Sequence, residues 1–307
     1  MTVLAFDTSN YTTSVAVFDG IRGHNVSQLL DVEQGSLGLR QSDALFAHVK
    51  RLPELTDRLF SDIGGLPIDA IGVSTRPRAV EGSYMPCFLA GVSAARTMAA
   101  ALGVPCYAFS HQQGHIAAAL WSAGRMDLME KPHLAWHLSG GTTELLLVEP
   151  DNKNVRASKI GGTGDISAGQ IMDRTGKMLS LQFPSGKELD RLSRTVEKPE
   201  FFKVKTANLT FSLSGLENKV SDYCANHSRE ETAAYAVRSV VDVIIRTTKD
   251  AQKAYPGLPV VFSGGVASNS MLRDLTQPLG AVFAEPALST DNAMGIAILT
   301  WLQEGTL

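Results

Sequence analysis

Two histidines one helical turn apart are the sharpest chemical signal in the sequence. They are His111 and His115 in the segment His-Gln-Gln-Gly-His, and they face the same side if a helix begins near Ser110. Two neutral imidazole nitrogens at this spacing suit a transition metal, although a pair of surface or capping histidines explains them equally well. A metal site therefore needs a third ligand from elsewhere in the chain.

Asp291 is the candidate for that third ligand. It lies in the polar turn Leu-Ser-Thr-Asp-Asn-Ala, directly before an apolar helix. The carboxylate could instead simply cap the helix that is expected to start near residue 292. Two imidazoles and one carboxylate would leave coordination positions open for a substrate, as in catalytic metal sites, and both zinc and iron(II) accept such ligands.

Three loops rich in glycine and hydroxyl residues follow apolar runs and could hold an anion. The first contains Asp7, Thr8, Ser9 and Thr12, the second is Leu138-Ser139-Gly140-Gly141-Thr142, and the third contains Gly264, Gly265 and Asn269. A strand that ends in glycines before a helix presents free backbone N–H groups to a phosphate. One Gly-Gly turn is more often only a turn, but three such loops in one chain favour a nucleotide site.

The first two loops are expected at the tips of two similar β-hairpins. Residues 3–18 and 134–148 each consist of an apolar run, a polar turn and a second apolar run. Setting Ala5 against Ala135 aligns the two segments without a gap and brings the hydroxyl residues of the turns into matching positions. This match predicts an internal duplication.

Helices are expected over most of the remaining sequence. In residues 230–254, for example, apolar side chains recur at helical spacing and form a wide face that packs in a core. The predicted helical segments are 44–62, 83–102, 112–123, 166–181, 212–225, 230–254 and 292–304. Strand hairpins that alternate with helices, twice over, indicate an α/β protein of two lobes with a cleft between them.

Composition excludes some classes of function. With 307 residues, of which 44% are hydrophobic, the chain is long enough for two packed domains. Its formal net charge of −3 does not resemble a stand-alone nucleic-acid-binding protein, so any RNA contact must be local or shared with a partner. The pairs Arg76 with Arg78 and Lys203 with Lys205 come nearest to basic patches, but ordinary solvated charges explain them more simply.

The cysteines and the apolar segments bear on location. Cys87, Cys106 and Cys224 are scattered and odd in number, which argues against a disulfide framework and fits a reducing cytoplasm. We expect neither a signal peptide nor a membrane span.

Sequence motifs resemble one known family along nearly the whole chain: the tRNA threonylcarbamoyladenosine transferases, TsaD in bacteria, once called O-sialoglycoprotein endopeptidases. The matching blocks, in family order, are DTS…TSVAV, HxxGH at 111–115, LSGG at 138–141, SAGQxxD at 167–173, PSG at 184–186, FSLSGL at 211–216, SGGVASN at 263–269 and STDNA at 289–293. By themselves, Asp173 would lie on a solvated helix face and Gly186 in a turn. The resemblance gives both residues a role.

The resemblance implies the two-lobed actin-like ATPase fold of actin, Hsp70 chaperones and sugar kinases, with a duplicated core. We expect an N-terminal lobe over residues 1–110, completed by the C-terminal helix 292–307, and a C-terminal lobe over 111–291 that carries the metal and nucleotide sites. The family's metal ligands fall on His111, His115 and Asp291. Residues 138–142 fall on a loop that holds phosphate and substrate atoms, and Asp173, Gly186 and Asn269 on positions that bind an adenylate.

The implied reaction is transfer of a threonylcarbamoyl group from threonylcarbamoyl-AMP to N6 of the adenine adjacent to the anticodon in tRNA. The resemblance implies one divalent metal ion, Fe²⁺ or Zn²⁺, and ATP or ADP could also bind. By analogy we expect a paralogous actin-like subunit and a P-loop ATPase as partners, in the cytoplasm and without a membrane.

Several residues depart from the family pattern and leave alternatives open. Thr12 and Gln170 each replace a glutamate, Thr142 replaces a histidine, and Asn10 and Tyr11 replace a cysteine and an acid. One alternative is a non-catalytic paralogue that binds nucleotide and metal within a tRNA-modifying complex. Another is an ATP-dependent kinase or ATPase that uses Asp7 to organise magnesium, in which the paired histidines would have no obvious task.

Overall fold

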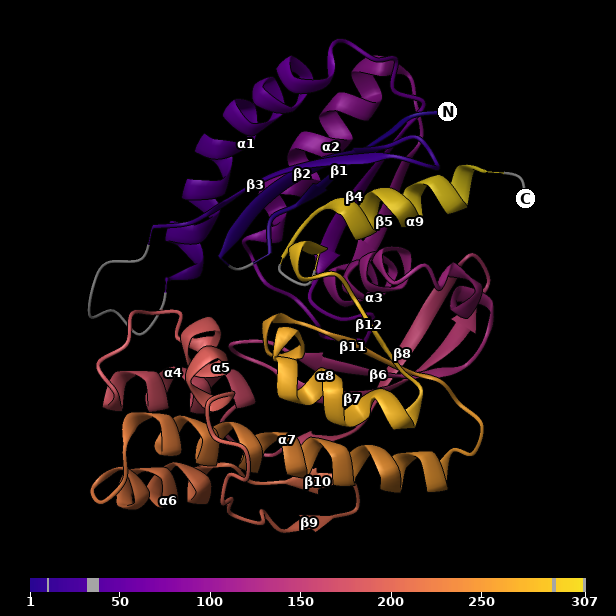
Figure 1. Ribbon diagram of the computed structural model, residues 1–307. Coiled ribbons are helices and arrows are strands. Elements are labelled where there is room, and N and C mark those ends of the chain that lie inside the picture. Colours follow the sequence, from indigo (N-terminus) through magenta and orange to yellow (C-terminus); the bar gives the residue numbers. More distant parts are fainter. Residues whose placement is uncertain (10, 32–38, 289–290, 306–307) are drawn as a thin grey trace. The chain divides into compact units, whose positions relative to one another are not determined.

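The computed structural model describes residues 1–9, 11–31, 39–288 and 291–305, which fall into two compact units (Figure 1). Unit 1 consists of Met1–Lys131, Glu149–Ala157 and Asp291–Leu307, and unit 2 of Pro132–Val148 and Ser158–Thr290. The first unit thus continues past the boundary expected after residue 110. All three candidate metal ligands therefore belong to unit 1, whereas the sequence placed the metal site in the second lobe.

A five-stranded mixed sheet forms the centre of unit 1. Its order is β3-β2-β1-β4-β5. The strands are β1 (Val3–Asp7), β2 (Thr12–Phe18), β3 (Gly23–Leu29), β4 (Ala70–Arg76) and β5 (Cys106–Ser110). Strand β4 runs parallel to both β1 and β5. Because parallel strands end at the same edge of a sheet, their last residues Asp7, Arg76 and Ser110 share one edge.

Helices cover both faces of this sheet. They are α1 (Gln41–Ile63), α2 (Phe88–Leu102), α3 (His111–Ser122) and α9 (Met294–Glu304), with the short 3-10 helix η1 (Met126–Glu130). Leu4 and Phe6 of β1 share a core cluster with residues of α1 and α2. Helix α9 packs on the opposite face, because a Cβ atom on Gly72 of β4 would lie 1.8 Å from Thr300. Ala5 of β1 pairs with Gly72 and so faces α9 as well. Asp7 lies two residues after Ala5 and therefore points to the same face.

Close packing of α3 against α9 explains why unit 1 extends beyond residue 110. A Cβ atom on Gly295 would lie 1.8 Å from the carbonyl oxygen of Gly114, so this approach requires glycine. The tip of the β7–β8 hairpin joins the same unit, because Gln113 Nε2 donates a hydrogen bond to the Val155 carbonyl at 2.8 Å.

Unit 2 contains a seven-stranded sheet with the order β12-β11-β6-β7-β8-β10-β9. The strands are β6 (His133–Leu138), β7 (Thr143–Asp151), β8 (Asn154–Thr163), β9 (Thr206–Ala207), β10 (Thr210–Phe211), β11 (Val260–Ser263) and β12 (Ala281–Phe283). The helices are α4 (Ala168–Met178), α5 (Gly186–Ser193), α6 (Ser214–Cys224), α7 (Arg229–Ala254) and α8 (Ser270–Thr276), with the 3-10 helices η2 (Gly265–Ser268), η3 (Gln277–Leu279) and η4 (Pro286–Leu288). The core contains Trp136, Leu145 and Phe262, which are fully buried against apolar residues of these helices.

The two sheets repeat one topology, which confirms the predicted duplication. Strand β6 pairs antiparallel with β7 and parallel with β11, just as β1 pairs with β2 and β4. Val3 lies opposite Phe18 in the first hairpin and His133 opposite Val148 in the second, so both strands are displaced by the same 130 residues (133 − 3 and 148 − 18). The register is the one that the gap-free alignment predicted.

The expectations on membrane segments and thiols can be compared with the structure. No helix in the described part of the chain combines the length and the apolar character needed to cross a membrane. Cys87, Cys106 and Cys224 are free thiols.

Candidate metal centre and nucleotide loops

Helix α3 begins where the two histidines require it to begin. Ser110 is its N-cap and forms a capping box with Gln113: the Ser110 side chain accepts from the Gln113 backbone N–H, and the Gln113 side chain accepts from the Ser110 N–H. His111 is therefore the first helical residue and His115 lies one turn later. Their rings meet edge to face with centroids 4.3 Å apart.

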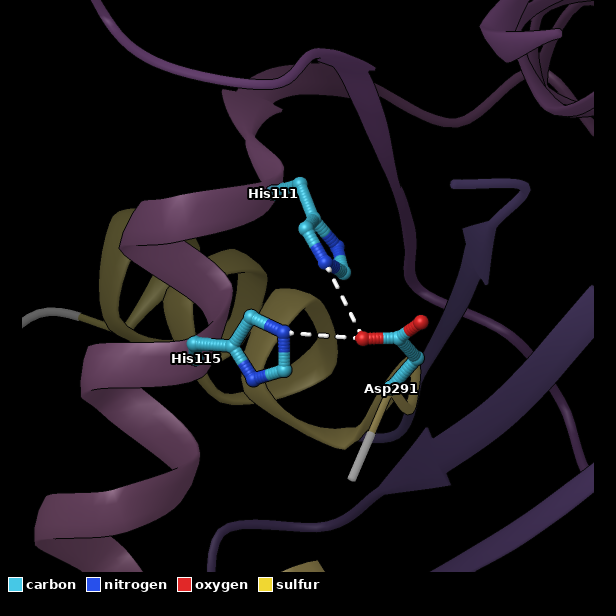
Figure 2. A group of neighbouring side chains, drawn as sticks. All are labelled: His111, His115 and Asp291. Carbon is cyan, nitrogen blue, oxygen red and sulfur yellow. Dashed lines mark hydrogen bonds and ion pairs between the residues drawn. The ribbon is translucent and has the colours of Figure 1, made fainter. Parts of the chain in front are cut away.

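Asp291 reaches both imidazoles from the chain just before α9. Its Oδ1 lies 3.4 Å from His111 Nε2 and 3.1 Å from His115 Nε2. Helix α9 has Ala293 as its N-cap, without a side-chain capping bond. The Asp291 carboxylate thus turns toward the histidines and does not cap the helix, as Figure 2 shows. Ser289 and Thr290 of the same motif lie outside the described residues.

The three donor atoms fit a divalent transition metal. One ligand atom from each of His111, His115 and Asp291 lies within 4.8 Å of the others. Ligands about 2.1 Å from a tetrahedral ion are about 3.4 Å from one another, close to both nitrogen–oxygen distances given above. Two imidazoles and a carboxylate are also ligands that zinc and iron(II) accept. Three protein donors leave a fourth position for a substrate atom.

A second carboxylate stands behind His111. Asp7 is almost fully buried at the end of β1, and its Oδ2 lies 2.8 Å from His111 Nδ1. Because a carboxylate can only accept, Nδ1 must carry the hydrogen, which leaves Nε2 to face Asp291. The other oxygen, Oδ1, accepts the backbone N–H of Ser9 at 2.9 Å. The sequence had grouped Asp7 with a phosphate loop and gave no sign of this contact, since 104 residues separate the pair.

Electrostatic interactions couple the protonation states of His111, Asp7 and Asp291. Burial alone would lower the pKa of His111, but the carboxylates of Asp7 and Asp291 outweigh burial and raise this pKa from 6.5 to about 10. Burial would raise the pKa of both carboxyl groups, and the imidazole of His111 nevertheless holds them below their ordinary value. In the metal-free protein His111 is therefore an imidazolium between two carboxylates. A metal ion must displace that proton.

The other residues of the first loop are buried next to Asp7. The Thr8 hydroxyl donates to the Cys87 carbonyl at 3.1 Å and accepts the backbone N–H of Gly91 at 3.2 Å, which fixes the end of β1 to the start of α2. The Ser9 hydroxyl is buried and has no hydrogen-bond partner among the described residues. Thr12 is buried at the start of β2. A phosphate role for this loop stays a prediction.

In unit 2 the loop from Leu138 to Thr142 is a tight turn. The backbone N–H of Ser139 donates to the Thr142 carbonyl at 2.8 Å, and the N–H of Thr142 donates to the Ser139 hydroxyl at 3.0 Å. A Cβ atom built on Gly140 or on Gly141 would meet nothing within 4 Å. Both glycines therefore border open space, which a ligand can approach closely.

The third loop packs directly on this turn. Gly264 has a positive φ of 94°, and a Cβ atom there would lie 2.3 Å from the Leu138 carbonyl oxygen, so only glycine fits. Gly265, like the glycines of the turn, borders open space. Asn269 caps α8 by accepting the Leu272 N–H at 3.0 Å.

Two carboxylates that belong to α4 and α5 hold the remaining loop residues. Asp173 accepts the backbone N–H of Ser185 at 2.9 Å, next to Gly186. Asp190 accepts from the Asn269 amide at 2.8 Å, so it fixes the orientation of that side chain. These contacts fix α4 to the start of α5, and α5 to the third loop. Asp190 was not predicted, because one acid on an amphipathic helix carries no signal of its own.

Comparisons with known proteins identify the family. A family model described as TsaD, tRNA N6-adenosine threonylcarbamoyltransferase, matches residues 31–298. The tRNA N6-adenosine threonylcarbamoyltransferase of Lacticaseibacillus casei (strain BL23) is 33% identical over 288 residues, which cover 89% of this chain and 81% of that protein. The protein of the same name from Thermosipho africanus is 30% identical over 319 residues, covering 97% and 93% of the two chains.

Similar solved structures establish the fold. Full-length HypF matches with a TM-score of 0.62 at 13% identity, over 99% of this chain and 56% of that chain. The ROK hexokinase of Thermus thermophilus matches with a TM-score of 0.56 at 16% identity, over 99% of both chains. These likenesses confirm the actin-like ATPase and sugar-kinase fold. Because the family model covers most of the sequence, the chain belongs to the TsaD family of tRNA N6-adenosine threonylcarbamoyltransferases.

Proposed function

We propose that the chain transfers the threonylcarbamoyl group from threonylcarbamoyl-AMP to N6 of the adenine adjacent to the anticodon in tRNA, with one Fe²⁺ or Zn²⁺ ion held by His111, His115 and Asp291. The observation that carries this proposal is the convergence of these three donors in a member of this transferase family. A purely structural role for the histidines would not require a carboxylate within 3.1–3.4 Å of both rings.

The chemistry explains what the site must supply. The adenine amine is a weak nucleophile, because its lone pair is delocalised into the ring. A new C–N bond forms between N6 and the carbamoyl carbon, the C–O bond to the phosphate of AMP breaks, and N6 loses one proton. A bound divalent metal supplies Lewis-acid stabilisation of the negative charge that develops in such an acyl transfer.

In this proposal the residues around His111 prepare the metal ligands. Asp7 fixes the ring so that Nε2 faces the carboxylate of Asp291. The edge of the buried Phe88 ring lies against the same imidazole, with centroids 6.4 Å apart, and limits its rotation from another side. A ligand held in place before the substrate arrives loses little entropy at the moment of reaction.

The glycine loops of unit 2 are proposed to bind the adenylate. Gly140, Gly141 and Gly265 have open space where a side chain would stand, so a phosphate can approach their backbone N–H groups without side-chain obstruction. Asn269, held by Asp190, has one amide hydrogen left to donate after its bond to that carboxylate. Asp173 and Gly186 are proposed to contact the nucleoside. A catalytic base is not assigned.

The kinase alternative has less support than the transferase. It needs Asp7 to organise magnesium, but Asp7 contacts the imidazole of His111, and magnesium prefers oxygen ligands. The paralogue alternative relies in part on Gln170. In the capping box of α4, Gln170 bonds reciprocally with Ser167, which either glutamine or glutamate can do. Of the other departures from the family pattern, Tyr11 is only partly buried, and Asn10 lies outside the described residues.

The test is transfer of labelled threonine to tRNA that lacks the modification. Purified chain is supplied with threonylcarbamoyl-AMP, with the expected paralogue and P-loop ATPase added in a parallel reaction. We expect label in tRNA from the wild-type chain and its loss in His115→Ala together with most bound metal. Full transfer by a His111→Ala variant, or no transfer by wild type in both reactions, would falsify the proposal.

A further inference from the structure

A loop between β4 and α2 lies next to the metal centre and presents exposed chemical groups. It runs from Arg76 to Tyr84 and is called here the 76–84 loop. Arg76 and Arg78 are exposed, and Tyr84 exposes 63% of its surface. The metal ligands are positioned without these side chains, and the fold does not bury them. Exposed side chains beside a metal site can contact a substrate.

The first end of the 76–84 loop is fixed to the start of the metal-binding helix. Arg76 pairs with Ser110 in the β4–β5 register, and Ser110 directly precedes His111. One residue further on, the Pro77 carbonyl accepts the backbone N–H of Gln112 at 3.0 Å. The backbone at Arg76 is therefore fixed beside Ser110, the residue that precedes the metal ligand His111.

The second end is fixed to the other side of the same centre. Cys87 accepts a hydrogen bond from Thr8, the neighbour of Asp7. Phe88 follows and contacts the His111 ring edge to face. The loop thus starts beside the helix that carries His111. It ends beside Thr8, the neighbour of Asp7, and at Phe88, which contacts the His111 ring.

The tip of the loop is closed by its own hydrogen bonds. The backbone N–H of Arg78 donates to the Ser83 hydroxyl at 3.0 Å, and the N–H of Ser83 donates to the Val80 carbonyl at 3.3 Å. These bonds turn the backbone on itself between Arg78 and Ser83. Arg78 and Tyr84, the residue after Ser83, are therefore close along one closed turn.

The side chains suit single-stranded RNA. Guanidinium groups bind phosphates, and an exposed tyrosine ring is a platform for a nucleobase. Arg76 makes no ion pair with any residue that the structure describes. The loop contains one acid, Glu81, so its arginines outnumber its carboxylates by two to one. A chain with a net charge of −3 needs such a local contact to hold a polyanion.

We propose that the 76–84 loop is the surface that receives the anticodon loop of the tRNA substrate. Arg76 and Arg78 bind backbone phosphates, and the Tyr84 ring stacks on a base beside the reacting adenine. This inference rests on the proposed function and adds the RNA-contacting element. The competing role for Arg76, binding the phosphate of the adenylate, is an outcome of the test below.

Binding of a fluorescent anticodon stem-loop RNA to the full chain, measured by anisotropy at several KCl concentrations, tests the inference. The variants are Arg76→Gln, Arg78→Gln and Tyr84→Leu. Each arginine variant should weaken binding and reduce the slope of log Kd against log KCl by about 0.7, the value for one phosphate contact on a single strand. Tyr84→Leu should weaken binding by about 5- to 150-fold, the range for loss of one base-stacking contact.

Arg22→Gln is the matched control. Arg22 is exposed in the turn between β2 and β3, at the opposite edge of the same sheet, about 17 Å away for a five-residue strand. It should leave RNA affinity and salt slope unchanged. Bound zinc and the melting temperature should match the wild type in all four variants, which excludes misfolding as the cause.

Three results would overturn the inference. They are wild-type binding without salt dependence, arginine variants with the wild-type slope, and an Arg76→Gln variant that loses AMP affinity while it keeps RNA affinity. Failure of the proposed function is recognised separately, because the wild-type chain would then transfer no threonine to tRNA whatever its RNA affinity.

Discussion

Replacing Asp7 by asparagine tests whether this buried carboxylate serves the metal centre. The substitution keeps the size of the side chain and leaves an oxygen that can accept from His111 Nδ1, but it removes the charge. The contact is short, at 2.8 Å, and the Asp7 side chain is only 2% exposed, so solvent screens it little. Mutation of the residue that holds a metal-binding histidine from behind typically weakens metal affinity about 10- to 100-fold, or about 1.4–2.7 kcal/mol.

The measurement is a zinc titration of the full chain in competition with a chromophoric chelator. Asp19→Asn is the control, because Asp19 is an exposed carboxylate in the turn after β2, at the far edge of the sheet. We expect a weaker zinc Kd for Asp7→Asn and the wild-type Kd for Asp19→Asn. Nitrogen-15 NMR of the His111 ring in the metal-free protein adds a second readout, since loss of the Asp7 charge should lower the pKa of this imidazole. An unchanged Kd with an unchanged titration of His111 would refute the role of Asp7.

Three further predictions concern stability and the metal helix. Because the pKa of His111 is raised from 6.5 to about 10, protonation of this imidazole contributes its full stabilisation to the metal-free protein below about pH 6.5, and this contribution is lost as the pH rises toward 10. Thermal unfolding in chelator should show that loss, and a flat profile there would contradict the charge assignment. Gly264→Ala should lower the free energy of unfolding by about 1–3 kcal/mol, because Gly264 has a positive φ and its added Cβ would clash with the Leu138 carbonyl. Urea denaturation measures this change. The control is Gly265→Ala, whose added Cβ meets nothing within 4 Å and which should differ from wild type by much less. Ser110→Ala removes the cap of α3 and should cost about 0.5–2 kcal/mol while raising the zinc Kd, and wild-type values of both would show that the cap does not position His111.

Local pattern was enough to predict the duplicated hairpins. The alignment of Ala5 with Ala135 has no gap, and the pairing register repeats with the same displacement. A two-residue periodicity fixes which side chains share a face, so the register follows from the pattern. Strand β3 was not predicted, because Gly23–Leu29 is mostly polar and forms a strand only by pairing with β2 at the sheet edge.

Helix existence was predicted better than helix ends. The segment expected as a helix from residue 83 begins at Phe88, since Pro86 disfavours helical backbone in the residue before it. Helix α5 was not predicted at all. It begins at the glycine of the Pro-Ser-Gly segment, and only Leu189 and Leu192, buried on one face, mark it as amphipathic.

The metal site could be assembled from sequence only in part. The spacing of His111 and His115 predicted a shared helix face, and Asp291 was a candidate from its polar turn, which the family resemblance then supported. Neither the spacing nor the resemblance predicted that Asp7 contacts His111. This contact depends on sheet topology, because β1 and β5 end at one edge and α3 begins there. Contacts between distant segments need the fold itself.

The interrupted course of unit 1 has a consequence for the order of synthesis. His115 and Asp291 are 176 residues apart, and Ser158–Thr290 of unit 2 are translated between them. While the ribosome makes that stretch, α3 has its histidines but neither the third donor nor the packing surface of α9. The nascent protein therefore cannot bring all three donors together until unit 2 has been made, so the proposed metal site is completed late in the maturation of this chain.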